Sequence, residues 1–138
     1  MPDVNEFNRA IIEEFRSHGG KVGGPFEGLP VLLLSTIGAR SGERRTTPVA
    51  YLEDGDRLVI FASKAGAPEN PAWYHNIVAN PEVTVEVGSE TRAVRASVLS
   101  GEERDRLFER QAERQPQFAE YAQRTTRVIP VVALQRDA

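Results

Sequence analysis

Apolar residues recur every three or four positions at the start of the chain, with charged residues between them. They are Val4, Phe7, Ile11, Ile12 and Phe15, and this spacing is typical of a helix with one buried face. Gly19 and Gly20 end the pattern, because glycine is a common stop signal for a helix. We therefore expect an N-terminal helix within residues 1–20, followed by a glycine- and proline-rich linker over residues 21–30.

Most of the remaining chain has the pattern of short strands joined by tight turns. Asp54-Gly55 stands between two apolar runs, which is a strong hairpin signal. Gly88-Ser89 separates two stretches in which valine or alanine alternates with polar residues. Pro130 in the last apolar run indicates an edge strand or a bulge, since proline donates no ladder hydrogen bond. The predicted strands cover residues 32–37, 46–52, 58–62, 83–87, 94–98 and 128–134.

Helix signals interrupt the strands at two places. Asn70 is a good N-cap ahead of Pro71 at the first helical position, and the helix that they begin should end before Asn80-Pro81. Ser100 and Glu103 form a capping box that predicts a second helix. Pro116 should divide this helix, leaving a short piece over residues 117–123.

These elements predict an α+β fold that is mainly β. Hairpins outnumber parallel crossovers, so we expect an antiparallel sheet that closes into a barrel with flanking helices. The pattern argues against a doubly wound sheet, because the chain lacks both a βαβ rhythm and a dinucleotide glycine fingerprint. At 138 residues, the chain should form a single domain over residues 1–138.

Composition narrows the class of protein. The chain has no cysteine, which excludes disulfides, thiolate metal sites and cysteine nucleophiles, and fits a reducing cytoplasm. A net charge of -3 argues against nucleic-acid binding. The opening residues do not resemble a secretory signal, and the longest apolar stretch is too short to span a bilayer. We expect a cytoplasmic protein without a metal site, since His18 and His75 lack ligand spacing.

A local basic patch interrupts this acidic chain. Residues 39–45 contain three arginines and one glutamate, which suggests a small anionic ligand. Gly38 and Gly42 allow backbone N–H groups to point at an oxyanion, and Ser41 adds a donor. Arg40 and Arg45 supply planar forks for phosphate or carboxylate. From charge alone, a solvated loop is the alternative.

A second candidate segment, residues 62–67, follows a predicted strand and is rich in small residues. Small side chains allow a flat ring to approach the backbone closely, although for this segment alone an ordinary loop is the favoured explanation. The helix that follows contains Trp73 and Tyr74. Such aromatic residues more often pack in a core than contact a cofactor.

The two segments join in one long motif, GARSGERRTTPVAYLEDGDRLVIFASKAGAPENPAWYHNIVANPEV over residues 38–83. This motif resembles the deazaflavin-dependent nitroreductase family of actinobacteria, and the closing RTTRVIPVVAL extends the resemblance to nearly the whole chain. The resemblance implies a split β-barrel of the FMN-binding split-barrel type. It also implies coenzyme F420, an 8-hydroxy-5-deazaflavin whose side chain carries a phosphate and an oligoglutamate tail.

The resemblance also implies roles for individual residues. The residues expected along the phosphate and tail are Arg40, Ser41, Arg45, Thr47 and Pro48. Those expected at the edge of the ring are Ala62, Ser63 and Lys64, with Ala72 and Asn76 close by. Multiply anionic tails favour arginine forks, so the charge pattern agrees with this placement.

The implied activity is hydride transfer from reduced F420 to an electron-poor acceptor such as a quinone, an activated enone or lactone, or a nitroaromatic. The proton would come from Tyr121, Ser63 or solvent. Relatives that activate nitroimidazole drugs have several tyrosines around the acceptor pocket. Here Tyr121 alone keeps that character, and Ala50, Gln115 and Phe118 occupy the other matching positions, which argues against activity on those drugs. Tyr51 does not replace Ala50, because neighbouring strand residues face opposite ways.

Alternatives remain at this point. The same barrel elsewhere holds FMN, for which fewer arginines would be needed, so FMN ranks behind F420. A non-catalytic carrier of F420, haem or a fatty acid is another interpretation, and a purely structural domain is a third. The partner is a small-molecule electron acceptor. A homodimer is expected only by analogy with other barrels, and attachment to a membrane surface is not favoured because the first helix lacks a cationic face.

Overall fold

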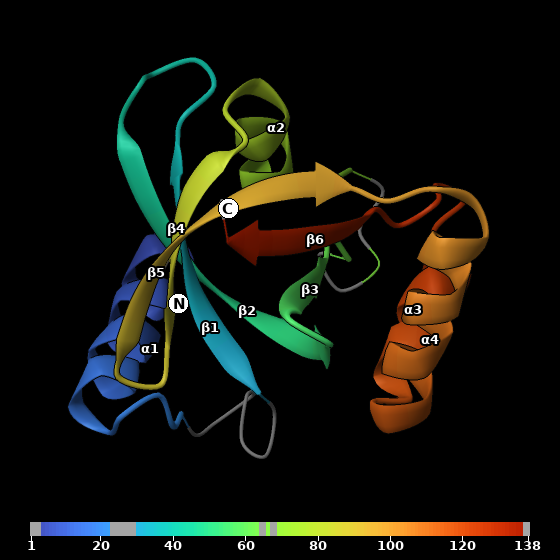
Figure 1. The fold of residues 1–138 in the computed structure, drawn as a ribbon, viewed down its shortest axis with the longest axis horizontal. Coiled ribbons are helices and arrows are strands. Elements are labelled where there is room, and N and C mark those ends of the chain that lie inside the picture. The colour runs from blue at the N-terminus through green and yellow to red at the C-terminus, as the bar shows by residue number, and fades with distance from the viewer. Residues whose placement is uncertain (1–3, 23–29, 64–65, 67–68, 137–138) are drawn as a thin grey trace.

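The structure is a computed structural model that describes residues 4–22, 30–63, 66 and 69–136 (Figure 1). The predicted linker falls largely outside the described residues. The helices are α1 (Val4–Ser17), α2 (Ala72–Ala79), α3 (Gly101–Arg114) and α4 (Gln117–Arg124). The strands are β1 (Val31–Ile37), β2 (Arg44–Asp54), β3 (Arg57–Phe61), β4 (Glu82–Val87), β5 (Glu90–Val98) and β6 (Val131–Arg136).

The six strands form a closed antiparallel barrel in the order β1-β2-β3-β6-β5-β4, which confirms the predicted fold class. The last strand, β6, pairs with β3 on one side and β5 on the other. The prediction that Pro130 marks an edge or a bulge is therefore wrong. Pro130 lies just before β6, where its carbonyl accepts a hydrogen bond from the Ala62 N–H (2.9 Å). Pro130 has no N–H to donate, and it lies outside both ladders of β6, which begin at Val131 and Val132.

Alternation along the strands fills the barrel with apolar side chains. The interior cluster contains Leu32, Leu34, Val49, Leu58, Ile60, Ala62, Trp73, Ile77, Val83, Val85, Val94, Ala96, Val132 and Leu134. Two of these residues, Trp73 and Ile77, belong to α2, which covers the end of the barrel where β1 and β3 stop (Figure 1). We call this end the α2 end.

A second apolar cluster lies outside the barrel, between β3, β6 and the helices α3 and α4. It contains Leu52, Val59, Phe61, Leu107, Phe108, Phe118, Ile129 and Val131. The ring of Phe61 meets Phe108 and Phe118 edge to face, with centroids 6.1 Å and 5.8 Å apart. We call this group the outer cluster. It fixes α4 beside the end of β3.

Two predicted helix caps differ from the observed ones. Pro71, not Asn70, holds the N-cap position of α2, and the Asn70 Oδ1 accepts a hydrogen bond from Arg127 instead (2.8 Å). Ser100 is the N-cap of α3 without a side-chain cap bond, so the predicted capping box is wrong. The Glu103 carboxylate pairs with Arg57 at 2.7 Å. In both cases a distant arginine competes successfully with the local backbone for the side-chain oxygen.

Among the helices of the described residues, none has the length and apolar character needed to cross a membrane. The same part of the chain contains no group of three or more histidine, aspartate or glutamate side chains placed to hold a metal ion.

Candidate functional site

The basic segment forms the turn between β1 and β2, at the α2 end of the barrel (Figure 1). The Gly38 N–H donates to Glu43 O at 2.8 Å, and the Gly42 N–H donates to Gly38 O at 3.0 Å. The Ser41 Oγ accepts from the Glu43 N–H at 3.1 Å, so the hydroxyl is part of the turn itself. This bonding leaves Arg40 exposed on the turn.

The predicted loop ends earlier than expected, because β2 already begins at Arg44. Arg45 is therefore a strand residue, and it stands opposite Thr36 of β1. Its guanidinium lies 3.5 Å from Glu43, with the two side chains 54% and 72% exposed. An exposed pair of this kind contributes about 0–1 kcal/mol. A ligand with several negative charges would compete with Glu43 for Arg45.

Asn76 ties α2 to this turn. Its buried amide accepts from the Ala39 N–H through Oδ1 (3.0 Å) and donates from Nδ2 to the Thr36 Oγ1 (3.0 Å). Because Thr36 faces Arg45 across the ladder, these bonds bring α2, the turn and Arg45 together. Ala72 is exposed in the first turn of the same helix. The structure thus gathers these predicted cofactor residues at one end of the barrel.

Thr47 and Pro48 point to opposite faces of β2, as consecutive strand residues must. Thr47 stands opposite Leu34 of the barrel interior, whereas Pro48 is buried opposite Leu33. The predicted tail-binding residues therefore do not share a single strand face. Pro48 lies on the same face as Ala50, two positions along the strand.

The second predicted segment follows β3. Ala62 is fully buried in the interior cluster and Ser63 is 9% exposed. Lys64 lies outside the described residues. The carbonyls of Ala62 and Ser63 accept hydrogen bonds from Nη1 (3.0 Å) and Nη2 (2.8 Å) of Arg127. Sequence reasoning missed Arg127, although an arginine directly before the apolar end of the closing motif was the available signal.

Gly66 brings this segment against α4. Its N–H donates to Ser63 O at 2.9 Å. A Cβ at Gly66 would lie 2.9 Å from Tyr121 O and 2.9 Å from the Arg124 Cβ, so only glycine fits against the helix here. The two predicted proton donors, Ser63 and Tyr121, consequently belong to segments that pack directly on each other.

Three of the four positions compared with the tyrosine-rich relatives meet at the outer cluster. Ala50 and Tyr121 pack against it, and the rings of Phe118 and Tyr121 lie 5.3 Å apart. The fourth, Gln115, is the C-cap of α3. Tyr51 packs against the barrel interior instead, on the other face of β2, which confirms that it does not replace Ala50. Burial raises the pKa of Tyr51, with Glu53 adding to the effect.

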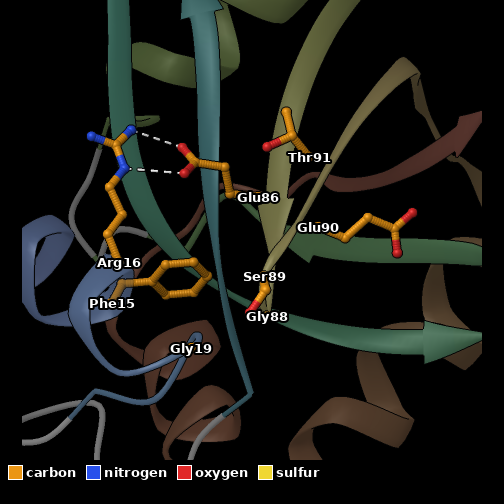
Figure 2. Close-up of a pocket in the computed structure, with 8 residues that line it drawn as sticks. All are labelled: Phe15, Arg16, Gly19, Glu86, Gly88, Ser89, Glu90 and Thr91. Carbon is orange, nitrogen blue, oxygen red and sulfur yellow. Dashed lines mark hydrogen bonds and ion pairs between the residues drawn. The ribbon is translucent and has the colours of Figure 1, made fainter.

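A separate cavity of about 200 Å³ lies between the end of α1 and the β4–β5 hairpin (Figure 2). Arg16 forms a bidentate ion pair with Glu86 at one side of the cavity. Its Nε donates to Oε1 at 3.0 Å and its Nη2 donates to Oε2 at 2.8 Å. Figure 2 shows Glu90 pointing away from this pair. The lining residues are Phe15, Arg16, Gly19, Glu86, Gly88, Ser89, Glu90 and Thr91. None of them is a predicted site residue, so the α2 end remains the candidate site.

Comparison with known proteins points to one family. A family model described as F420H(2)-dependent quinone reductase matches residues 7–136. An F420H(2)-dependent quinone reductase of Mycobacterium tuberculosis is 40% identical over 126 residues, covering 88% of this chain and 85% of that protein. A putative F420H(2)-dependent quinone reductase of the same organism is 38% identical over 106 residues, covering 77% and 89%.

Among solved structures, the F420-H2 dependent reductase FDR-A has a TM-score of 0.71 and 38% identity, covering 77% of this chain and 94% of that chain. A structure described as a domain-swapped dimer has a TM-score of 0.72 and 35% identity, covering 96% of each chain. These matches agree with the observed barrel.

Proposed function

The chain belongs to the F420H(2)-dependent quinone reductase family, and on this basis we propose that it reduces a quinone-like acceptor with reduced coenzyme F420. The resemblance deduced from the motif is therefore confirmed at the level of the family, the coenzyme and the class of enzyme. Two observations support the proposal: Asn76 of α2 is hydrogen-bonded to the basic turn, and the segment after β3 packs on α4 at the half-buried Tyr121.

The residues at the α2 end suit an anionic coenzyme. Arg40, Arg44 and Arg45 are exposed around a turn whose only acid is Glu43. Arginine presents a rigid fork that matches carboxylate and phosphate oxygens. We propose that Arg40 and Arg45 hold the phosphate and oligoglutamate tail, with Ser41, Thr47 and Pro48 shaping the path. Asn76 holds α2 against this turn, because its side-chain amide is hydrogen-bonded to the Ala39 N–H and to the Thr36 hydroxyl.

Ala62 and Ser63 are proposed to lie along the edge of the ring. Both are buried and both have their carbonyls held by Arg127, so this backbone is a fixed surface. When bound, the reduced deazaflavin ring supplies a hydride as a two-electron unit. The chain's own task is to place the acceptor beside that ring and to keep water away.

The acceptor is proposed to bind near Ala50, Phe118 and Tyr121. Ala50 and Tyr121 are partly exposed and pack on the buried Phe118, and they give an apolar and aromatic surface with a single hydroxyl, which suits a flat quinone ring. Reduction of a quinone to a hydroquinone requires a proton as well as a hydride. The Tyr121 hydroxyl and the Ser63 hydroxyl are the proposed donors.

Parallel titration with F420 and with FMN tests the coenzyme assignment. We expect quenching of F420 fluorescence at lower protein concentration than quenching of FMN fluorescence. Oxidation of reduced F420 should then depend on both the protein and added 2-methyl-1,4-naphthoquinone. Preference for FMN would overturn the coenzyme, and tight F420 binding without turnover of any quinone or enone would indicate a carrier.

We also propose a homodimer in the cytoplasm. A solved relative at 35% identity is a domain-swapped dimer, and the cysteine-free composition suits a reducing compartment. Light scattering after gel filtration should give twice the chain mass of 15.3 kDa. A mass of one chain at micromolar concentration would contradict the dimer.

A further inference from the structure

One guanidinium group joins three segments beside the candidate site. Arg127 lies between α4 and β6, and its Nη1 donates to Ala62 O at 3.0 Å and to the Asn70 Oδ1 at 2.8 Å. Its Nη2 donates to Ser63 O at 2.8 Å. We propose that Arg127 is a positioning residue for hydride transfer, which fixes the backbone after β3 in the shape that the reacting ring requires. This inference rests on the proposed function.

The position of Arg127 explains why it can control this backbone. The β3–β6 ladder ends at the pair Phe61 and Val131. Beyond that pair the chain is still buried, and buried carbonyls require hydrogen-bond donors. Arg127 supplies donors to the next two carbonyls, those of Ala62 and Ser63, in place of a further strand.

An arginine suits this task better than a lysine would. Its planar head presents several N–H groups in a fixed arrangement and can reach two successive carbonyls and the Asn70 amide at once. A lysine ammonium is a single point on a flexible stem. Burial lowers the pKa of Arg127, while the charge of Glu69 acts in the opposite direction. The group remains protonated, since arginine does not lose its proton in proteins.

The contacts continue from Arg127 to the acceptor side of the site. Ser63 O accepts both from Arg127 and from the Gly66 N–H (2.9 Å). Gly66 in turn packs on Tyr121 of α4. Loss of the Arg127 bonds should therefore shift Ser63 relative to Tyr121. The basic turn is held by other bonds, through Asn76, so binding of the anionic tail should survive.

Kinetics of Arg127→Lys separate positioning from binding. We expect kcat to fall on the order of 10- to 100-fold, the range for a misplacement of about 1 Å, whereas the F420 dissociation constant changes by less than about 3-fold. Asn70→Ala removes one of the three hydrogen bonds described above for Arg127, so kcat should fall less than in Arg127→Lys. Arg114→Ala, which alters an exposed arginine at the end of α3, is the matched control and should leave kcat unchanged.

Amide exchange in the coenzyme-free protein provides a second readout. In Arg127→Lys the Gly66 and Ala62 amides should exchange faster, while the Gly38 amide in the basic turn keeps its rate. If Arg127→Lys is globally unfolded by circular dichroism, Asn70→Ala takes its place in both measurements. Unchanged kcat and unchanged Gly66 exchange in the folded variant would overturn the inference. Failure of the wild-type protein to bind F420 would instead overturn the proposed function, and the exchange result would still show whether Arg127 fixes this backbone.

Discussion

At the scale of single residues, the role of each polar side chain in the site depends on how many strong hydrogen bonds or ion pairs it already forms within the protein. The Asn76 amide is buried and bonded at both ends, so it maintains the site rather than responding to a ligand. Arg45 is more than half exposed and its pairing with Glu43 is long. The binding energy for an anionic tail should therefore come from the exposed arginines. The buried Asn76 amide should instead keep the basic turn in position.

Replacement of Arg45 with alanine tests the first half of this argument. Arg45→Ala should weaken F420 binding by about 1.5–3 kcal/mol, the range for hydrogen bonds to charged groups. Affinity for a deazaflavin without the tail should change much less, as measured by fluorescence quenching. Arg95→Ala is the control, because Arg95 is a comparably exposed strand arginine paired with Glu82. Equal losses for both ligands would show that Arg45 does not hold the tail.

Replacement of Asn76 tests the second half. Asn76→Leu leaves the Ala39 N–H and the Thr36 hydroxyl without their partner, which should lower the free energy of unfolding by about 2–4 kcal/mol. Chemical denaturation measures this loss. His75→Ala, at an exposed position of the same helix, should change stability little. A stable Asn76→Leu protein with normal F420 affinity would show that Asn76 does not keep α2 and the basic turn in position.

At the scale of elements, close packing decides how α1 joins the barrel. Phe15 is buried, Arg16 pairs with Glu86 of β4, and the chain after the helix touches the β4–β5 hairpin (Figure 2). A Cβ at Gly20 would lie 2.7 Å from the Gly88 Cα, and Gly20 has a φ of +96°. Backbone therefore lies directly against backbone at this junction.

Gly20→Ala should loosen α1 from the hairpin. The positive φ alone costs about 1–2 kcal/mol for a residue with a Cβ, and overlap with Gly88 should add about 1–3 kcal/mol. Gly55→Ala is the matched control, since Gly55 has a φ of +63° but nothing within 4 Å of a Cβ. Thermal unfolding of both variants gives the difference. Equal losses would mean that the Gly20–Gly88 contact is relaxed without cost.

At the scale of the whole molecule, charged side chains attach the α3–α4 layer to the barrel. Asp54, at the β2–β3 turn, accepts from the Arg57 Nε (2.9 Å) and from Arg110 of α3 (3.0 Å). Arg57 also pairs with Glu103 of α3. The hydrogen bond from Arg57 holds the pKa of Asp54 below its usual range, and Arg110 contributes in the same direction.

The lowered pKa has a consequence for acid stability. A carboxyl group whose pKa falls on folding stabilises the protein above its unfolded pKa, about 3.9 for aspartate, and that stability is lost as the pH falls through the folded value. Asp54→Asn should therefore lower the free energy of unfolding at pH 7 by about 1–2 kcal/mol. The gap between the two proteins should close below about pH 4. A gap that is independent of pH would show that the charge of Asp54 does not contribute.

The sequence alone determined most of the local structure and the family. Alternating and helical periods, together with turn and cap signals, located the helices and strands of the described residues, because side-chain direction repeats every two residues in a strand and every 3.6 in a helix. The motif over residues 38–83 identified the coenzyme through its resemblance to a deazaflavin-dependent family, whereas the arginines by themselves indicated only a small anionic ligand. Boundaries were less accurate. The start of β2 was expected two residues late, so Arg45 was placed in a loop.

Tertiary structure decided which distant parts of the chain contact each other. Only barrel closure inserts β6 between β3 and β5, which removes the predicted edge at Pro130. Asn70 and Glu103 left their predicted capping roles because Arg127 and Arg57 offer them charged donors. The hydrogen bonds of Asn76 and Arg127 join residues that lie 37 or more positions apart in the sequence. Such contacts depend on which segments the closed barrel brings together, and a local pattern carries no information about partners at that distance.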